Sequence, residues 1–282
     1  MSVVFFCVGA AKAGTSWLHA QLADHPECHF RAIKELHYFD AVEAGQLDRE
    51  HEKHRQEHLR VQGYAGDDPN ERQEVLLRDR ADWMDVLSSG RQDDAAYLAY
   101  LRGGAGAARV VGEVTPAYAL LPRERLSAMA TVAPDVRVLY MLRDPVERLW
   151  SHVRMIAARR DDEGRVTARR AANILRRVFR GEEDQIERRG DYARALRKLQ
   201  ATIPQGRLML GVFEEMIAGG LDRLAAFLGI APFARVVAPV HAGQPLDMTA
   251  DQRQAAAAFL RPQYKAVERA LGRVPDSWHW KG

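Results

Sequence analysis

The chain has 282 residues, of which 47% are hydrophobic and 28% are charged, and its formal net charge is +3. This composition is ordinary for a folded globular protein and excludes a largely disordered one. So small a net charge does not indicate a nucleic-acid-binding protein, and no nucleic-acid partner is expected. No apolar run approaches the roughly 20 residues that span a bilayer, and the amino terminus lacks the features of a signal peptide. We therefore expect a cytoplasmic protein with no membrane partner.

The amino-terminal stretch predicts a strand, a glycine-bearing loop and an amphipathic helix. Residues 2–8 form an apolar run, the loop GAAKAGTS follows at 9–16, and helical periodicity begins near Trp17. Such a junction binds phosphate, because the first amides of a helix have no partner inside it and glycine lets the backbone close around an anion. A Walker A loop needs a lysine directly after its second glycine, here Gly14, whereas this lysine lies inside the loop at Lys12. The stretch predicts an anion-binding loop that is not an ordinary ATP site.

Two charged segments come next along the chain. The segment KELHYFD at residues 34–40 interleaves acids and a histidine with large apolar groups, which is the composition that a catalytic loop beside an anion site needs. Residues 41–95 are polar and carry many charges of both signs, with a turn signal near Pro69. We expect an inserted helical region there, and its function does not follow from the pattern.

Neither the cysteines nor the histidines predict a metal site. Cys7 lies in the first strand and Cys28 in the loop HPECHF, and two cysteines make no disulfide framework. Three histidines of the inserted region share one helical face, where a solvated stripe is favoured over metal binding because the helix is so highly charged. These histidines are His51, His54 and His58.

The rest of the chain alternates strands with helices. Apolar strands are predicted at 109–114, 136–142 and 207–213, and helices at 146–158, 168–186, 191–202, 219–228 and 249–271. Asp144 is placed to cap the helix at 146–158. Arg143 stands at the carboxyl end of a strand, where open α/β sheets bind ligands, and Ser151 follows two helical turns later, near the same face. The alternation predicts an α/β fold with a mostly parallel sheet flanked by helices on both faces.

Four segments in this order resemble motifs of the PAPS-dependent sulfotransferases, in particular of the bacterial and heparan-sulfate-type branch. They are KAGTS, KELHYFD, GEVTPAY and LRDPVERLWSH, and they lie within residues 3–158. The resemblance implies a P-loop-like central sheet and a single sulfotransferase domain over residues 1–282, with the polar helical insertion at 41–95. It also implies an enzyme that moves a sulfuryl group from PAPS to a hydroxyl by in-line displacement and releases PAP.

The resemblance assigns roles to particular residues. The first anion pocket, for the 5′-phosphosulfate, is the loop Lys12, Ala13, Gly14, Thr15, Ser16 and Trp17. The 3′-phosphate pocket is Arg143 with Ser151, and Tyr192 and the loop around His241 are suggested for the cofactor side. Lys12 stabilises the charge on the leaving phosphate. Glu35 is the candidate general base, His37 is the second choice, and no metal is required.

Structural alternatives stand beside these roles. Glu35 could form only an ion pair with Lys34 or Lys12, and His37 could be a satisfied, half-buried histidine. Arg143 could pair with Asp144 or Glu147, and Ser151 could be a small residue that faces the sheet. Glu113 and Tyr118 are expected to line the acceptor side, unless Glu113 only braces Lys12.

The acceptor is the least determined part of the hypothesis. A small hydroxylated metabolite is expected first and a carbohydrate next, because the mixed charge of 41–95 favours neither a polyanion nor a lipid. A homodimer is left open. The rival hypotheses are a P-loop kinase or other ATP-dependent phosphotransferase, and a catalytically silent nucleotide-binding module. The lysine missing after Gly14 argues against the kinase.

Overall fold

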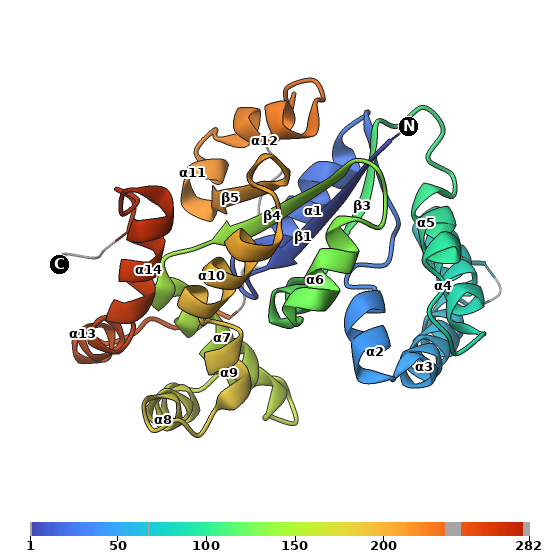
Figure 1. Cartoon of the computed structure of the whole chain (residues 1–282). Helices are drawn as coiled ribbons and strands as arrows, with labels where there is room; N and C mark the ends of the chain where they lie inside the picture. Colours follow the sequence, from blue (N-terminus) through green and yellow to red (C-terminus); the bar gives the residue numbers. More distant parts are fainter. Residues whose placement is uncertain (1, 67, 235–243, 279–282) are drawn as a thin grey trace.

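The computed structural model describes residues 2–66, 68–234 and 244–278, and its centre is a five-stranded sheet (Figure 1). The strands follow the spatial order β2-β3-β1-β4-β5, and every neighbouring pair is parallel. Their bounds are β1 (Val3–Gly9), β2 (Cys28–Phe30), β3 (Val110–Val114), β4 (Val136–Leu142) and β5 (Leu208–Val212). The α/β class and the parallel sheet predicted from the sequence are confirmed.

β1 lies in the middle of the sheet because its side chains are apolar on both faces. Residues 4–8 are fully buried, which is typical of a parallel strand covered by helices on both sides. Burial raises the pKa of Cys7 to about 12, so its thiol behaves as a core group. The prediction of a loop around Cys28 was wrong: this residue begins the edge strand β2, which pairs with β3. Three residues are too few to show the alternation that reveals a strand in a sequence.

Helices cover both faces of the sheet. In Figure 1, α1 (Thr15–Asp24) lies behind the strands, and α6 (Arg123–Ala130) and α10 (Tyr192–Thr202) lie in front of them. The chain leaves β1 toward the β2 edge and leaves β4 toward the β5 edge. Because crossovers between parallel strands are right-handed, these opposite directions place the connecting helices on opposite faces. The point between β1 and β4, where the connections diverge toward opposite edges, is the topological switch point of the sheet.

The region from residue 38 to residue 102 is a group of helices beside the β2 edge of the sheet (Figure 1). Its members are α2 (Tyr38–Ala44), α3 (Leu47–Ala65), α4 (Glu71–Leu87) and α5 (Asp94–Arg102). α3 and α4 pack against each other, and buried aromatic rings join the group to the sheet, with Tyr38 stacked on Tyr97 at 4.3 Å. The prediction that the three histidines are solvated is wrong for His54, whose ring is buried and packs edge-on against Trp83. His54 and Leu47 are the buried residues of the highly charged helix α3.

The carboxyl-terminal half adds further helices around the ends of β4 and β5. They are α7 (Pro145–Arg159), α8 (Ala168–Phe179), α9 (Asp184–Arg188), α11 (Phe213–Ile217), α12 (Leu221–Leu228), α13 (Ala250–Phe259) and α14 (Arg261–Leu271), with short 3₁₀ turns η1 (Pro116–Leu120) and η2 (Gln205–Arg207). Two helices predicted as continuous are each interrupted. Gly181 adopts a left-handed φ of 72° between α8 and α9, and α14 begins at Arg261 directly after Leu260, with Pro262 in its first turn. Within the described ranges, no helix combines the length and apolarity that crossing a membrane requires.

Candidate active site

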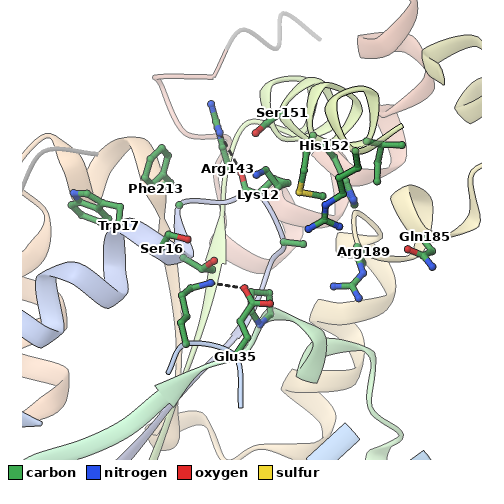
Figure 2. A pocket seen from close by; sticks show the side chains of 18 of the residues that line it. Lys12, Ser16, Trp17, Glu35, Arg143, Ser151, His152, Gln185, Arg189 and Phe213 are labelled. Carbon is green, nitrogen blue, oxygen red and sulfur yellow. Dashed lines mark hydrogen bonds and ion pairs between the residues drawn. The ribbon is translucent and has the colours of Figure 1, made fainter. Parts of the chain in front are cut away.

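A cavity of about 460 Å³ lies at the carboxyl ends of β1 and β4, where the strand order reverses (Figure 2). Open α/β sheets bind ligands at this point. The 9–16 loop, the end of β4, α7 and the loop around Glu35 all contribute to its wall. The predicted site residues found on this wall are Lys12, Gly14, Thr15, Ser16, Trp17, Glu35, His37, Arg143 and Ser151. Tertiary structure thus brings together residues from three separate segments of the chain.

The anion-binding loop ends in a glycine that its surroundings require. Gly14 is the N-cap of α1 with φ of 85°, and it has no side chain to cap the first amides of the helix. A Cβ atom at Gly14 would lie 2.1 Å from the ring of Phe213, which also packs edge-on against Trp17. Ala13 does not reach the wall, because it is buried and its N–H donates to the carbonyl of Ala10. The start of α1 therefore lies on the cavity wall, and Gly14 places no side chain over its first amides.

Replacing Gly14 by alanine is expected to lower the free energy of unfolding by about 2–4 kcal/mol, since it adds left-handed strain and a clash with Phe213. The matched control is Gly164→Ala, at φ of 70° with no described atom within 4 Å of the added Cβ. The control carries the strain alone and should cost about 1 kcal/mol. Urea unfolding of both variants measures the difference, and equal losses would show that the Phe213 contact does not constrain this loop.

Lys12 and Arg143 hold the loop and the end of β4 together. A guanidinium N–H of Arg143 (Nη1) donates to the carbonyl of Lys12 at 3.2 Å, and the guanidinium lies over the ring of Phe213 at 5.4 Å (Figure 2). Burial lowers the pKa of Lys12, and the nearby charges of Arg159 and Arg143 lower it further. The cavity therefore concentrates positive charge that an anionic ligand would offset.

Tyr192 positions Arg143 from behind the cavity wall. Its hydroxyl accepts from the N–H of Arg143 at 3.1 Å and donates to the carbonyl of the same residue at 2.9 Å. Tyr192 is fully buried and does not line the cavity, so a direct contact with a ligand is not what its position provides. The suggested residues around His241 lie outside the described part of the chain.

Asp144 and Glu147, the alternative ion-pair partners considered for Arg143, bind other groups. The carboxylate of Asp144 accepts from the amides at the start of α7, as the sequence predicts, and Glu147 contacts Arg253 at 2.6 Å. Ser151 lies on α7 and lines the cavity with Arg143 instead of facing the sheet. The strand end and the helix together present a guanidinium and a hydroxyl to the same space.

The loop that carries Glu35 contains a chain of charged contacts. Lys34 Nζ lies 2.5 Å from Glu35 Oε1, so the ion pair expected as an alternative does form. Across the loop, His37 Nε2 lies 3.7 Å from Glu35 Oε2, and His37 Nδ1 lies 2.7 Å from Asp40 Oδ2. Glu35 nevertheless also lines the cavity that contains Lys12. The ion pair with Lys34 therefore leaves Glu35 on the cavity wall.

The contacts of this loop set the charges of Glu35 and His37. Burial acts to raise the pKa of Glu35, but the close contacts with His37 and Lys34 outweigh it and lower the pKa to about 2. Burial acts to lower the pKa of His37, but the hydrogen bond to Asp40 and the nearby carboxylate of Glu35 outweigh it and raise the pKa to about 9. At neutral pH Glu35 is a carboxylate and His37 is an imidazolium. Only Glu35 is then ready to accept a proton.

The sequence led us to expect that Glu113 lines the acceptor side or braces Lys12. The structure shows neither arrangement. Glu113 is fully buried and accepts hydrogen bonds from the hydroxyls of Tyr97, Thr115 and Tyr118 at 2.5, 2.5 and 2.7 Å, and from the N–H of Leu36 at 3.2 Å. The hydroxyl of Tyr118 in turn accepts from the N–H of Tyr38 at 2.9 Å. The GEVTPAY segment therefore holds the backbone of the loop on both sides of His37.

Backbone strain concentrates at the same residues. Within the described ranges, the non-glycine residues with positive φ are Lys12 (69°), Glu35 (62°) and His37 (57°). Left-handed backbone at such residues costs on the order of 1–3 kcal/mol each and persists only where surrounding contacts impose it. Those contacts are the bond from Arg143 to Lys12 and the bond from Leu36 to Glu113. Three of the candidate site residues chosen from the sequence, Lys12, Glu35 and His37, are therefore held in a strained backbone conformation.

The stability of the protein should depend on pH through His37. Because its pKa is raised in the folded state, the stabilisation is fully present below pH 6.5 and is lost as the pH rises through about 9. The advantage of the wild type over His37→Gln should shrink by about 3 kcal/mol between pH 6.5 and pH 10. Urea unfolding at steps of one pH unit measures this, with His51→Gln as control. A constant difference would mean that Asp40 and Glu35 do not hold a charged ring.

The sequence did not reveal several residues of the cavity wall. Arg159 lies two helical turns beyond Ser151 on α7, so the spacing already used for Ser151 could have found it. No sequence signal points to Gln185 and Arg189, which line the cavity from α9 and the turn after it, opposite Ser16 and Trp17 (Figure 2). His152 also lines the wall, and burial lowers its pKa to about 3, so its ring is neutral. Among the described residues no group of His, Cys, Asp and Glu could hold a metal ion.

Comparisons with solved structures agree with this fold. The chain is similar to a sulfotransferase from Alicyclobacillus acidocaldarius at 23% identity and a TM-score of 0.65, covering 99% of this chain and 100% of that one. It is also similar to the sulfotransferase domain of the Synechococcus PCC 7002 olefin synthase, at 15% identity and a TM-score of 0.53, covering 92% and 94%. A sulfotransferase domain from the curacin biosynthetic pathway matches at 15% identity and a TM-score of 0.51, covering 90% and 83%. At these identities the likeness supports the fold alone.

A family model supplies the stronger result. No match was found among curated proteins. The model of the sulfotransferase family matches residues 5–234, which include the anion-binding loop, the Glu35 loop, Arg143 and Ser151. The match covers most of the chain and every segment that builds the cavity. The chain therefore belongs to the sulfotransferase family.

Proposed function

We propose that the protein transfers a sulfuryl group from PAPS to a hydroxyl of a small acceptor and releases PAP. The observation that carries this proposal is one cavity in which two cationic subsites meet a carboxylate. The subsites are the Lys12 loop at the start of α1 and the pair Arg143 and Ser151, and the carboxylate is Glu35. PAPS carries a 5′-phosphosulfate and a separate 3′-phosphate, so its binding needs two anion subsites of this kind.

The residues of the cavity fit this donor. The amides at the start of α1 and the hydroxyls of Thr15 and Ser16 would hold the 5′-phosphosulfate. The Arg143 guanidinium and the Ser151 hydroxyl would hold the 3′-phosphate through charge-assisted hydrogen bonds. Burial lowers the pKa of Lys12 most and repulsion from neighbouring cations lowers it further, and a bound dianion would offset that repulsion. The donor supplies the reactive sulfuryl group, and the protein supplies charge and position.

The transfer needs one proton acceptor and one group that stabilises the leaving phosphate. The acceptor hydroxyl oxygen forms a bond to sulfur as the bond from sulfur to the bridging oxygen breaks, and PAP departs with that oxygen. The hydroxyl proton passes to the Glu35 carboxylate. Lys12 neutralises the charge that develops on the leaving phosphate.

Glu35 is a better candidate base than His37 in this structure. His37 carries a proton at neutral pH, whereas Glu35 does not. A carboxylate with so low a pKa is a weak base, and an acceptor that separates Glu35 from Lys34 would raise its basicity. His37, which Asp40 holds, would orient Glu35 through their 3.7 Å contact.

Thermal-shift measurements test the donor. PAP should raise the melting temperature without added metal, and ATP with Mg²⁺ should raise it much less. A response to ATP with Mg²⁺ alone would support a phosphotransferase and overturn the proposal. A response to PAP with no transfer to any acceptor would support the silent nucleotide-binding module. Incubation with labelled PAPS and a panel of hydroxylated acceptors separates this last case.

A further inference from the structure

A second cavity, of about 550 Å³, lies against the other side of the Glu35 loop. Its wall shares Lys34, Glu35 and His37 with the first cavity. The rest of the wall comes from α3 and α4, which lie side by side in Figure 1, and from Ile33. Glu35 therefore stands between the cavity that fits the donor and a separate space large enough for a small molecule.

His54 lines this second cavity and carries a buried hydrogen-bond donor without a partner among the described residues. Its Nδ1 lies 3.1 Å from Nη1 of Arg80, and a guanidinium has only donors, so Nδ1 must accept. The ring proton is then on Nε2, because burial keeps the ring neutral by lowering its pKa to about 3. Nε2 is buried with no hydrogen-bond partner in the described part of the chain, and Glu50 Oε2 at 3.9 Å is too far to accept. The side chain is only 5% exposed, so water from bulk solvent has little access to it.

Arg80 presents a second donor set beside His54. Its Nε is buried and also has no hydrogen-bond partner among the described residues, and its Nη2 lies 3.7 Å from Glu57 Oε1. Glu57 is engaged more closely by Arg60, at 2.5 Å. The Arg80 side chain is only 12% exposed, and burying a guanidinium with unpaired donors costs free energy. A ligand that accepts hydrogen bonds from it would offset that cost.

The whole wall carries more cations than anions. The positively charged residues on it are Lys34, His37, Lys53, Arg60 and Arg80, and the acidic residues on it are Glu35 and Glu57. The unpartnered groups described above are donors, and none of them can accept a hydrogen bond. An oxyanion satisfies this arrangement, whereas an aliphatic group or a cation does not.

We infer that this second cavity receives the acceptor, and that the acceptor is a compact hydroxylated molecule carrying a carboxylate or a phosphate. Arg80 and the Nε2–H of His54 bind its oxyanion, and its hydroxyl lies at Glu35. This inference rests on the proposed sulfuryl transfer and names the substrate class for it. It also narrows the expectation from the sequence, because basic residues outnumber acidic ones where the 41–95 region forms this wall.

Calorimetric titration of the protein saturated with PAP tests the inference without turnover. The probes are two matched pairs, gluconate with sorbitol and glucose 6-phosphate with glucose, which separate a carboxylate from a phosphate. The anionic member of at least one pair should bind about 10-fold or more tightly than its neutral partner. Arg80→Gln and His54→Phe should each reduce that preference to within about threefold. Phe keeps the ring packing against Trp83 and removes both ring nitrogens.

The control is Arg78→Gln, which makes the same charge change at an exposed position of α4 and should leave the preference unchanged. PAP affinity is measured for every variant and should stay within about threefold of wild type, which shows that each variant is folded. Equal binding of charged and neutral probes, no probe binding, or a preference that survives Arg80→Gln would overturn the inference. Failure of the wild type to bind PAP would instead overturn the proposed function.

Discussion

Replacing Glu35 by glutamine should lower kcat by about 10²–10⁴-fold and leave the affinity for PAP within about threefold of wild type. Glutamine keeps the shape of the side chain but cannot take up the hydroxyl proton. The backbone of the loop is held by Glu113 through Leu36 and by Tyr118 through Tyr38, so the strained conformation should survive the substitution. Single-turnover transfer and PAP titration measure the two quantities separately.

The control for this experiment is Glu43→Gln on α2, whose carboxylate pairs with Arg125 outside both cavities. It should change neither quantity. Loss of PAP binding in the Glu35 variant would assign Glu35 to the donor site. Full activity in the Glu35 variant, combined with inactivity of His37→Asn, would instead assign proton transfer to His37.

Replacing Arg143 by glutamine should weaken PAP binding by about 10–100-fold, because a charge-assisted bond to phosphate contributes roughly 1.5–3 kcal/mol. The same variant should bind 5′-AMP, which lacks a 3′-phosphate, with an affinity within about threefold of wild type. Tyr192 holds only the backbone of Arg143 and therefore remains in place. Calorimetry of both ligands with both proteins completes a cycle that isolates the 3′-phosphate.

Arg169→Gln is the matched control, since it removes one positive charge from an exposed position on α8. It should leave the affinity for both ligands nearly unchanged, because salt screens the effect of a distant exposed charge. Equal losses for PAP and 5′-AMP in the Arg143 variant would show that this residue acts by supporting the Lys12 loop through its hydrogen bond to that carbonyl. Ser151→Ala should follow the same pattern with a smaller loss.

The two halves of the candidate site differ in how far the sequence reveals them. The anion-binding loop is local: a buried strand, two glycines and a helix start determine it within sixteen residues, and the structure has this form. Arg143 and Ser151 follow from a strand end and a helical period, which are also local. Gln185 and Arg189 reach the cavity only because α9 folds back against α7, which no periodicity encodes.

The sequence by itself determined the parallel α/β sheet and the loop at Lys12, because hydrophobic periodicity and glycine placement act over a few residues. Its composition also singled out the charged loop at Glu35. Only the tertiary structure decided the ionisation of these groups and the role of Glu113. The charges of Glu35 and His37 depend on burial balanced against Lys34 and Asp40, and Glu113 became a buried support because residues from β3, η1 and α5 converge on it. The same holds for His54, since its ring proton is on Nε2 only because Arg80 on the neighbouring helix donates to Nδ1. Such balances depend on distances between segments far apart in the chain, and those distances exist only in the folded protein.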